Sequence, residues 1–372
     1  MACVAFGVLT PRAALGAIDG ATLVLLLGMM GIAALLGVDG FFERAATALA
    51  ARAATPARLL GWLVWGVGGL SALLTNDAVC VLATPIVVTL VARHRLPAAP
   101  FLLAIATAAN TGSVATLVGN PQNMLAASLG GLDYLDHLAL AGPVAVVGLA
   151  VNHALLALVY RRALAAAGDR LPTEPSPPLL TRRWAVTLGA VAVLVGLHSA
   201  GADLAAAAIG VLAVLLLVRR HDVDHVWRGV DWSILVFFGG LFVVVGGLTA
   251  SGATDTLFAR VPLAGGGEGA LADARLAAVF LVGSNVVSNV PFILVVKSQM
   301  ATLPDPRLGW ELLAMASTFA GNLTLLGSVA NVIVAEKGRV VGGFGFLEHL
   351  RVGLPLAVVT TALGTAWMVA VA

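Results

Sequence analysis

Ser71–Pro85 reads SALLTNDAVCVLATP, so three polar side chains, Thr75-Asn76-Asp77, interrupt an apolar segment that runs from about 57 to 92. Ser288-Asn289 interrupts a second apolar segment, at about 276–297, in the same way. Backbone that breaks at membrane depth is tolerated only where protein encloses a hydrated site. We therefore expect each segment to form a re-entrant helical hairpin whose tip marks a functional site.

The composition is that of an integral membrane protein. The 372 residues are 60% hydrophobic and 11% charged, and the mean hydropathy is +1.00. A soluble domain carries about 25% charged residues. The net charge of +2 and the scattered basic residues argue against nucleic-acid binding. The two cysteines, Cys3 and Cys80, support neither a disulfide framework nor a cysteine-based metal site.

Membrane-spanning helices need roughly 20 apolar residues. Candidates occur at about 20–38, 98–118, 137–160, 184–200, 203–218, 231–251, 308–335 and 350–372. Threading these spans and the two hairpins alternately through a bilayer puts 16 of the 21 Lys and Arg residues on one side. That side is predicted to be cytoplasmic, because positive charge is retained there. The sequence thus predicts a multi-pass protein of the inner (cytoplasmic) membrane.

Three short patterns recur in the same order near 210 residues apart, which indicates an internal repeat. The pairs are Asp19–Gly28 with Asp231–Gly240, Ser71–Asn76 with Ser284–Asn289, and Thr116–Asn123 with Thr324–Asn331. The predicted orientation runs the two copies in opposite directions, as in inverted-repeat transporters. We expect a first repeat at 1–160, a cytoplasmic linker at 161–183 and a second, inverted repeat at 184–372. The helix at 203–218 has no full counterpart, so the first repeat is expected to have a shortened amino-terminal helix.

The asparagines concentrate in the matched regions. Eight of the nine lie there: Asn76, Asn110, Asn120, Asn123, Asn285, Asn289, Asn322 and Asn331. An asparagine side chain offers an acceptor and two donors without net charge, which suits an ion site inside a membrane. A single buried asparagine equally suits hydrogen bonding between packed helices. The symmetric placement of the set favours the binding site.

Glycines beside these polar positions predict broken helices. Gly119 and Gly327 occur at matched positions, and Pro121 removes a backbone donor just after Asn120. Unwinding there would expose carbonyl groups to a cation, while the amino ends of half-helices attract an anion. Asp77 is the only carboxylate at a hairpin tip. We interpret it as a proton or cation coupling site, or alternatively as a helix cap for Ala78 onward in a hydrated vestibule.

The predicted site has two groups of residues. Those expected to bind the substrate or ion are Thr75, Asn76, Asp77, Asn120, Asn123, Ser288, Asn289, Ser328 and Asn331. Those expected to support them are Asn110, Thr116, Gly119, Asn285, Asn322, Thr324 and Gly327. No catalytic residue and no cofactor is predicted. The expected coupling ion is H⁺ or Na⁺, with Na⁺ at the hairpin tips as the only metal ion.

Four motifs carry a resemblance to a known group: Ser71–Pro85, Gly119–Leu125 (GNPQNML), Ser284–Pro291 (SNVVSNVP) and Gly321–Glu336 (GNLTLLGSVANVIVAE). Over nearly its whole length the chain resembles the ion transporter superfamily, which includes arsenite permeases, NhaD-type sodium/proton antiporters and divalent-anion/sodium symporters. The resemblance implies an inverted-repeat fold with two re-entrant hairpins whose tips meet broken helices.

The tips differ from those of the dicarboxylate symporters, in which each tip carries Ser-Asn-Thr. The third position is Asp77 at the first tip and Val290 at the second. These differences weaken the case for a dicarboxylate, and Asn-Asp at the first tip is more similar to the arsenite-permease branch. By resemblance, substrate or cation contacts are assigned to Thr75, Asn76, Ser288 and Asn289, and then to Asn120, Asn123, Ser328 and Asn331 on the broken helices.

The leading hypothesis is a secondary active transporter, an anion permease for a small inorganic ion or oxyanion such as arsenite, coupled to H⁺ or Na⁺. A Na⁺/H⁺ antiporter and a di- or tricarboxylate symporter remain as alternatives, with an intramembrane enzyme or a passive channel more remote. The sequence has no H-E-x-x-H motif and no G-x-x-x-x-G-K-[ST] motif. We therefore expect no enzymatic activity, and energy from ion gradients or a separate ATPase subunit. The other expected partners are the lipid bilayer and a second copy in a homodimer.

Overall fold

The computed structural model describes residues 2–168, 182–220, 222–260, 262–263, 267 and 269–371. Within these residues the regular structure is entirely helical. Six of the described helices are long and apolar enough to cross a membrane. These observations confirm the predicted all-α polytopic membrane fold. Residues 169–181, most of the predicted linker, lie outside the described part.

The first repeat contains a hairpin and a broken helix between two spanning helices. Its elements are α1 (Ala2–Ala5), α2 (Pro11–Gly16), α3 (Gly20–Val38), α4 (Phe41–Arg52), α5 (Pro56–Leu73), α6 (Asn76–His94), α7 (Ala98–Ser113), α8 (Pro121–Gly130) and α9 (Tyr134–Val159). Helices α5 and α6 form the first hairpin, and α7 and α8 are the two halves of the broken helix. Helix α10 (Arg161–Ala166) follows in the predicted linker, and α11 (Arg182–Ser199) lies at the start of the predicted second repeat, 184–372.

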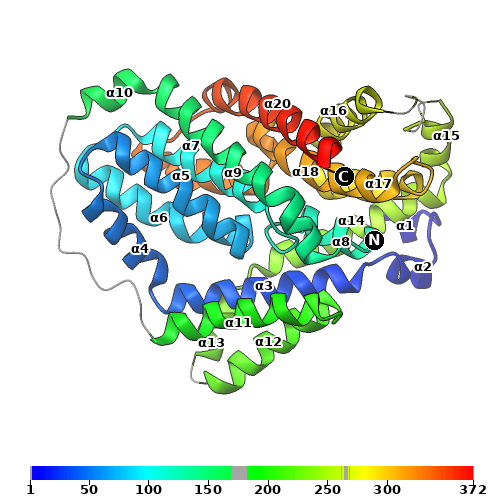
Figure 1. Cartoon of the computed structure of the whole chain (residues 1–372). Coiled ribbons are helices and arrows are strands. Elements are labelled where there is room, and N and C mark those ends of the chain that lie inside the picture. The colour runs from blue at the N-terminus through cyan, green and yellow to red at the C-terminus, as the bar shows by residue number, and fades with distance from the viewer. Residues whose placement is uncertain are drawn as a thin grey trace.

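The second repeat runs through the same order of elements. They are α12 (Leu204–Val218), α13 (Val223–Gly229), α14 (Trp232–Ala250), α15 (Ala253–Arg260), α16 (Ala270–Val287), α17 (Asn289–Met300), α18 (Pro306–Leu323), η1 (Leu325–Gly327), α19 (Val329–Gly338), η2 (Arg339–Val341) and α20 (Phe346–Val371). Helices α16 and α17 form the second hairpin, and α18 and α19 the second broken helix. Figure 1 shows the first hairpin in the left half of the view and the second in the right half.

Two aspartates at matched positions of the repeats cap long helices: Asp19 is the N-cap residue of α3, and Asp231 is the N-cap residue of α14. The Asp19 carboxylate accepts a hydrogen bond from the Thr22 backbone N–H at the start of α3. The Asp231 carboxylate does the same for the backbone N–H groups of Ser233 and Ile234 at the start of α14. Such caps satisfy N–H groups that have no partner within the helix. They explain why the predicted segments 20–38 and 231–251 begin where they do.

Helices α3, α11, α12 and α13 pack along one face of the molecule, below the two hairpins in the view of Figure 1. Helices α3 and α12 approach closely because Gly28 faces the Ala208 backbone. At their carboxyl ends, Arg219 donates to both Asp39 carboxylate oxygens at 2.8 and 2.6 Å. The Asp39 and Asp222 carboxylates raise the pKa of the Arg219 guanidinium above its ordinary value. This ion pair joins the ends of α3 and α12.

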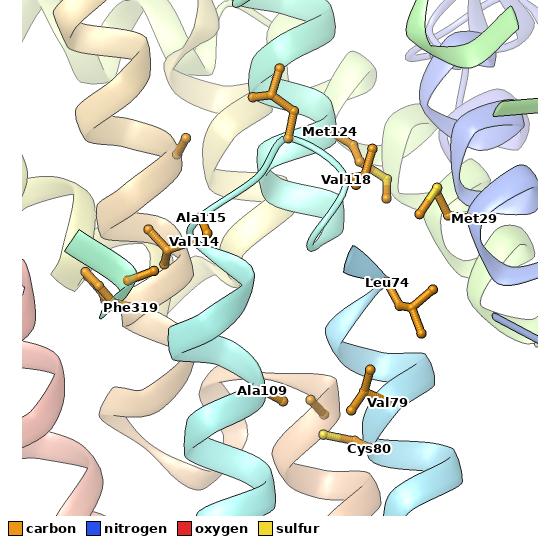
Figure 2. Close-up of a cluster of buried hydrophobic side chains, with 14 of the residues drawn as sticks. Met29, Leu74, Val79, Cys80, Ala109, Val114, Ala115, Val118, Met124 and Phe319 are labelled. Carbon is orange, nitrogen blue, oxygen red and sulfur yellow. The ribbon is translucent and has the colours of Figure 1, made fainter. Parts of the chain in front are cut away.

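The two hairpins and the two broken helices pack with α9 and α20. We call this group of helices the hairpin unit. Figure 2 shows the apolar shell around the first hairpin tip, with Leu74 and Val79 beside it and Met29 of α3 opposite. Val118 and Met124 close the shell from the α7–α8 segment. Apolar side chains thus pack around part of the polar tip.

Two sequence-based boundaries are wrong. The segments at 98–118 and 308–335 were predicted as spans, but α7 ends at Ser113 and α18 ends at Leu323. The polar and glycine-rich residues that follow take up an irregular conformation, so the predicted unwinding occurs within the predicted spans. The sequence also gave no indication of α4, α13 or α15, because these short helices lack a long apolar run.

Gly112 provides a test of this packing. A Cβ atom at Gly112 would fall on the Gly68 carbonyl of α5, whereas a Cβ atom at Gly69 would meet nothing within 4 Å. We expect Gly112→Ala to lower the free energy of unfolding by about 1–3 kcal/mol through overpacking. Gly69→Ala is the matched control and should be neutral or stabilising. Thermal unfolding of both purified variants in detergent measures the difference, and equal melting temperatures would contradict the close α5–α7 crossing.

Candidate functional site

The first hairpin tip lies against the first helix break. The Asn76 backbone N–H donates to the Gly119 carbonyl at 2.9 Å. The Thr116 hydroxyl donates to the Ala72 carbonyl at 2.6 Å. Gly119 has no room for a side chain, because a Cβ atom would fall on the Ser113 carbonyl. The glycine therefore allows the chain between α7 and α8 to fold tightly against the tip.

Asn120 and Asn123 hold the first break in shape. Asn120 Oδ1 accepts from the Asn123 backbone N–H at 2.8 Å, and its Nδ2 donates to Ser113 Oγ at 2.9 Å. Asn123 Nδ2 donates to the carbonyls of Ser113 at 3.1 Å and Thr116 at 2.9 Å. Asn123 Oδ1 accepts from the Thr318 hydroxyl of α18 at 3.0 Å. The side chains of both residues are thus occupied by protein partners.

The second hairpin tip meets the second break in a corresponding way. Asn289 Nδ2 donates to the Gly327 carbonyl at 3.1 Å, and Asn285 Nδ2 donates to the Ala320 carbonyl at 2.9 Å. The Thr324 hydroxyl donates to Asn285 Oδ1 at 3.2 Å. Ser288 has a φ of +81°, which is rare for a residue with a side chain and indicates strain at the tip. A glycine, Gly119 or Gly327, is therefore the contact point for each tip.

Asn110 joins the two repeats. Its Oδ1 accepts from Asn76 Nδ2 at 2.9 Å and from Ser328 Oγ at 3.1 Å. Its Nδ2 donates to Asn322 Oδ1 at 3.1 Å and to Asn331 Oδ1 at 3.0 Å. Five predicted site residues from the first hairpin, α7 and the second broken helix therefore form one hydrogen-bonded cluster.

Oxygen atoms without protein partners occur in both hairpins, at the matched pairs Ser71 and Ser284 and Asn76 and Asn289, and also at Thr75. Within the described part of the chain, five buried side-chain oxygens there have no hydrogen-bond partner: Ser71 Oγ, Thr75 Oγ1, Asn76 Oδ1, Ser284 Oγ and Asn289 Oδ1. The Asn76 and Asn289 side chains already donate through Nδ2, so each Oδ1 points away from that bond. An amide oxygen can only accept, and burying it unpaired costs about 1–3 kcal/mol. The arrangement suits a bound cation or donor.

Four half-helices begin in the same region. Asn76 is the first residue of α6, Asn289 of α17, Pro121 of α8 and Val329 of α19. The cluster around Asn110 links the starts of α6 and α19 directly. The unpaired N–H groups and the dipole at a helix start carry partial positive charge. The region can therefore attract an anion next to the oxygens that suit a cation.

A cavity of about 690 Å³ reaches the first tip. Thr75, Asp77 and Pro121 line its inner end, and α3 and the α13–α14 segment form its walls. Asp77 is half-buried and, among the described residues, has no hydrogen-bond or ion-pair partner. The alternative prediction, that Asp77 is the cap of a helix beginning at Ala78, is wrong about where the helix starts. Helix α6 begins at Asn76, and Thr75 is its N-cap residue. Ser288 and Asn289 do not line this cavity.

A family model described as "Citrate transporter" matches residues 1–320. The chain belongs to the citrate transporter family. It is therefore a membrane transporter and not an enzyme.

The chain is also similar to three named proteins and to one solved structure. The "46 kDa membrane protein" of Mycobacterium leprae is 32% identical, over 93% of this chain and 85% of that one. The silicon efflux transporter LSI3 of Oryza sativa subsp. japonica is 30% identical, over 97% and 89%. The putative transporter arsB of Dictyostelium discoideum is 25% identical, over 96% and 84%. The Alcanivorax borkumensis YdaH transporter structure shares the fold, with a TM-score of 0.58 and 17% identity over 99% and 86% of the two chains.

Sequence reasoning missed a buried ionisable pair in this citrate transporter family member. His137 of α9 lies 2.6 Å from Glu311 of α18 through Nδ1 and Oε2, and the two side chains are 0% and 3% exposed. His137 Nε2 lies 3.1 Å from the Val114 carbonyl, at the start of the first break. His137 therefore joins the carboxylate of α18 to the carbonyl at the end of α7.

The second repeat has a matching histidine without a carboxylate. His349 of α20 lies 212 residues after His137. Asn322 lies the same number of residues after Asn110, so the two histidines occupy matched positions of the repeats. Its Nε2 is 2.9 Å from the Asn322 carbonyl, near the end of α18. Both histidines therefore support the helix end that precedes a break. An ionisable residue inside a predicted span, such as Glu311 in 308–335, is the signal that could have identified the pair.

The pair predicts a clear pattern of stabilities. Glu311→Ala should lower the free energy of unfolding by about 3–5 kcal/mol, because it leaves His137 buried without its partner. Replacing both residues, as His137→Leu with Glu311→Met, should recover most of that loss. Asp136→Ala is the control: it breaks an ion pair with Arg307 that is 57% and 68% exposed, and should cost less than about 1 kcal/mol. Similar melting temperatures for Glu311→Ala and Asp136→Ala would contradict the assignment.

Proposed function

We propose that this protein is a secondary active transporter that carries a small inorganic oxyanion across the inner membrane, coupled to Na⁺ bound at the hairpin tips. The observation that carries the proposal is the matched pair of buried, unpartnered amide oxygens, Asn76 Oδ1 and Asn289 Oδ1. Amide oxygens coordinate metal cations but take up no proton at cellular pH. These two amide oxygens therefore favour Na⁺ over H⁺ as the ion bound between them and the substrate.

The substrate class rests on charge and on the names of relatives. The starts of α6, α8, α17 and α19 bring partial positive charge to the tips. A sodium ion bound there would add a full positive charge beside the substrate. The family description names citrate, and two relatives are named for silicon efflux and as arsB. Citrate is an oxygen-rich carboxylate, and the missing hydroxyls at Asp77 and Val290 favour an inorganic oxyanion over a carboxylate.

The transport step is proposed to be a movement of the hairpin unit against the helices α3, α11, α12 and α13. The cavity at the first tip lies at the boundary between these two parts, with α3 and the α13–α14 segment on one side and Thr75 and Asp77 on the other. Sliding the tip past α3 would close that cavity. The arginine-rich side is cytoplasmic in this proposal, so the cavity with Arg228 at its mouth opens to the cytoplasm.

Reconstitution into proteoliposomes tests the proposal. Uptake and efflux of arsenite, silicic acid, phosphate, sulfate and citrate would be measured with an imposed Na⁺ or proton gradient. We expect Na⁺-dependent transport of at least one inorganic solute, reduced about tenfold or more in Asn76→Ala and Asn289→Ala through loss of a coordinating oxygen. Asn152→Ala is the control and should retain transport, because the buried Asn152 side chain accepts from the Thr107 hydroxyl of α7 and not from a hairpin residue. Gradient-driven transport by the chain alone would also show that no ATPase subunit is needed.

Na⁺/H⁺ antiport is the second candidate function, and Asp77 is the observation that favours it. Asp77 is the carboxylate at the inner end of the cavity and has no partner among the described residues. In an antiporter, Asp77→Asn would abolish proton movement and remove the pH dependence of Na⁺ flux. In an oxyanion symporter coupled only to Na⁺, the same variant would retain its pH profile. Proton flux measured with an entrapped pH-sensitive dye separates the two outcomes.

A further inference from the structure

A groove of about 590 Å³ lies on the outer surface of α5, between α4 and α9, on the side predicted to be cytoplasmic. It is distinct from the cavity at the hairpin tip. Its lining includes Arg52 of α4, Arg58, Gly61, Trp62 and Trp65 of α5, and His153 of α9. The groove has basic and aromatic side chains together on a surface that would face lipid.

The groove residues of α5 form a single stripe that is basic near the start of the helix and aromatic further along it. Arg58, Gly61, Trp62 and Trp65 are spaced three and four residues apart, so they share one helix face. Seven residues separate Arg58 from Trp65, a rise of about 10 Å along the helix. Trp62 and Trp65 remain 47% and 39% exposed. The stripe thus runs from a cation near the helix start to aromatic rings deeper along it.

Gly61 allows α9 to complete the groove. A Cβ atom at this position would lie 2.9 and 3.0 Å from Cε1 and Nε2 of His153. The imidazole can therefore rest directly on the α5 backbone. This places the His153 side chain of α9 in the lining together with Arg52 of α4 and Arg58 of α5.

The charge in the groove is uncompensated. Among the described residues, no acidic side chain lines it. Arg52 uses one guanidinium nitrogen, Nη1, to donate to the Ala48 carbonyl of its own helix at 3.2 Å. The rest of that guanidinium and the exposed Arg58 retain N–H groups for another partner. A planar guanidinium matches the geometry of phosphate oxygens.

We propose that this groove binds an anionic phospholipid of the cytoplasmic leaflet. Its phosphodiester lies between Arg52 and Arg58, and an acyl chain runs along Trp62 and Trp65. Basic pockets between helices on the cytoplasmic side bind anionic headgroups, and tryptophan rings prefer the membrane interface. A second copy of the chain fits less well, because a two-fold contact would place this basic patch against itself. The bound lipid would tie the open end of the first hairpin to α4 and α9.

Quenching of tryptophan fluorescence by brominated lipid tests the site. The full-length protein in detergent would be titrated with brominated phosphatidylglycerol or brominated phosphatidylcholine. We expect phosphatidylglycerol to quench at lower mole fraction. Each arginine near an anionic headgroup contributes a factor of about five in affinity, so Arg52→Gln with Arg58→Gln should lower the preference about 30-fold. Arg161→Gln with Arg162→Gln, on the same side in α10, is the matched control and should keep it.

Further measurements distinguish a bound lipid from a free anion or a second protein in the groove. Trp62→Phe with Trp65→Phe should remove the high-affinity part of the quenching, although five of the seven tryptophans remain. Equal quenching by the two lipids, or a preference unchanged by the arginine variants, would overturn the proposal. Displacement of the lipid by millimolar inorganic phosphate would show a free-anion site instead. Conversion of a dimer to a monomer by the tryptophan variants, measured by light scattering, would show a protein interface instead.

Discussion

The Asn110 side chain is the contact on which the rest of the site depends. It is 1% exposed, and it bonds to Asn76, Ser328, Asn322 and Asn331 at once. A broken helix inside a membrane leaves donors and acceptors that lipid cannot satisfy. Asn110 satisfies groups from both repeats without introducing charge. Asn110 Oδ1 accepts a hydrogen bond from Asn76 Nδ2, and Asn76 Oδ1 is left without a protein partner.

The two repeats share a plan but have diverged in their chemistry. At the first tip, Asp77 faces a cavity, whereas the equivalent position at the second tip is Val290. At the second tip, Ser288 adopts a strained backbone conformation, whereas Thr75 does not. Only the first repeat's histidine, His137, has a carboxylate partner. Each half therefore contributes the same scaffold, and the two tips differ in charge and in backbone conformation.

Much of this arrangement could be predicted from the sequence. The hairpins, the two breaks and the boundaries of α3 follow from apolar runs interrupted by polar residues, a local pattern. The partners could not be predicted. Asn110 pairs with Asn331 and His137 pairs with Glu311 across 221 and 174 residues, and nothing in a single sequence records that proximity. Asn120 and Asn123 were expected to bind the ion, and that remains a prediction, but the structure shows their side chains engaged within the protein.

Direct binding of radioactive sodium to the purified protein tests the central claim most directly, because it requires no knowledge of the substrate. The account predicts saturable binding that choline does not compete with and that Asn76→Ala and Asn289→Ala each weaken. Saturable binding of equal strength in both variants and in the unmodified protein would contradict it, and so would the absence of any sodium binding.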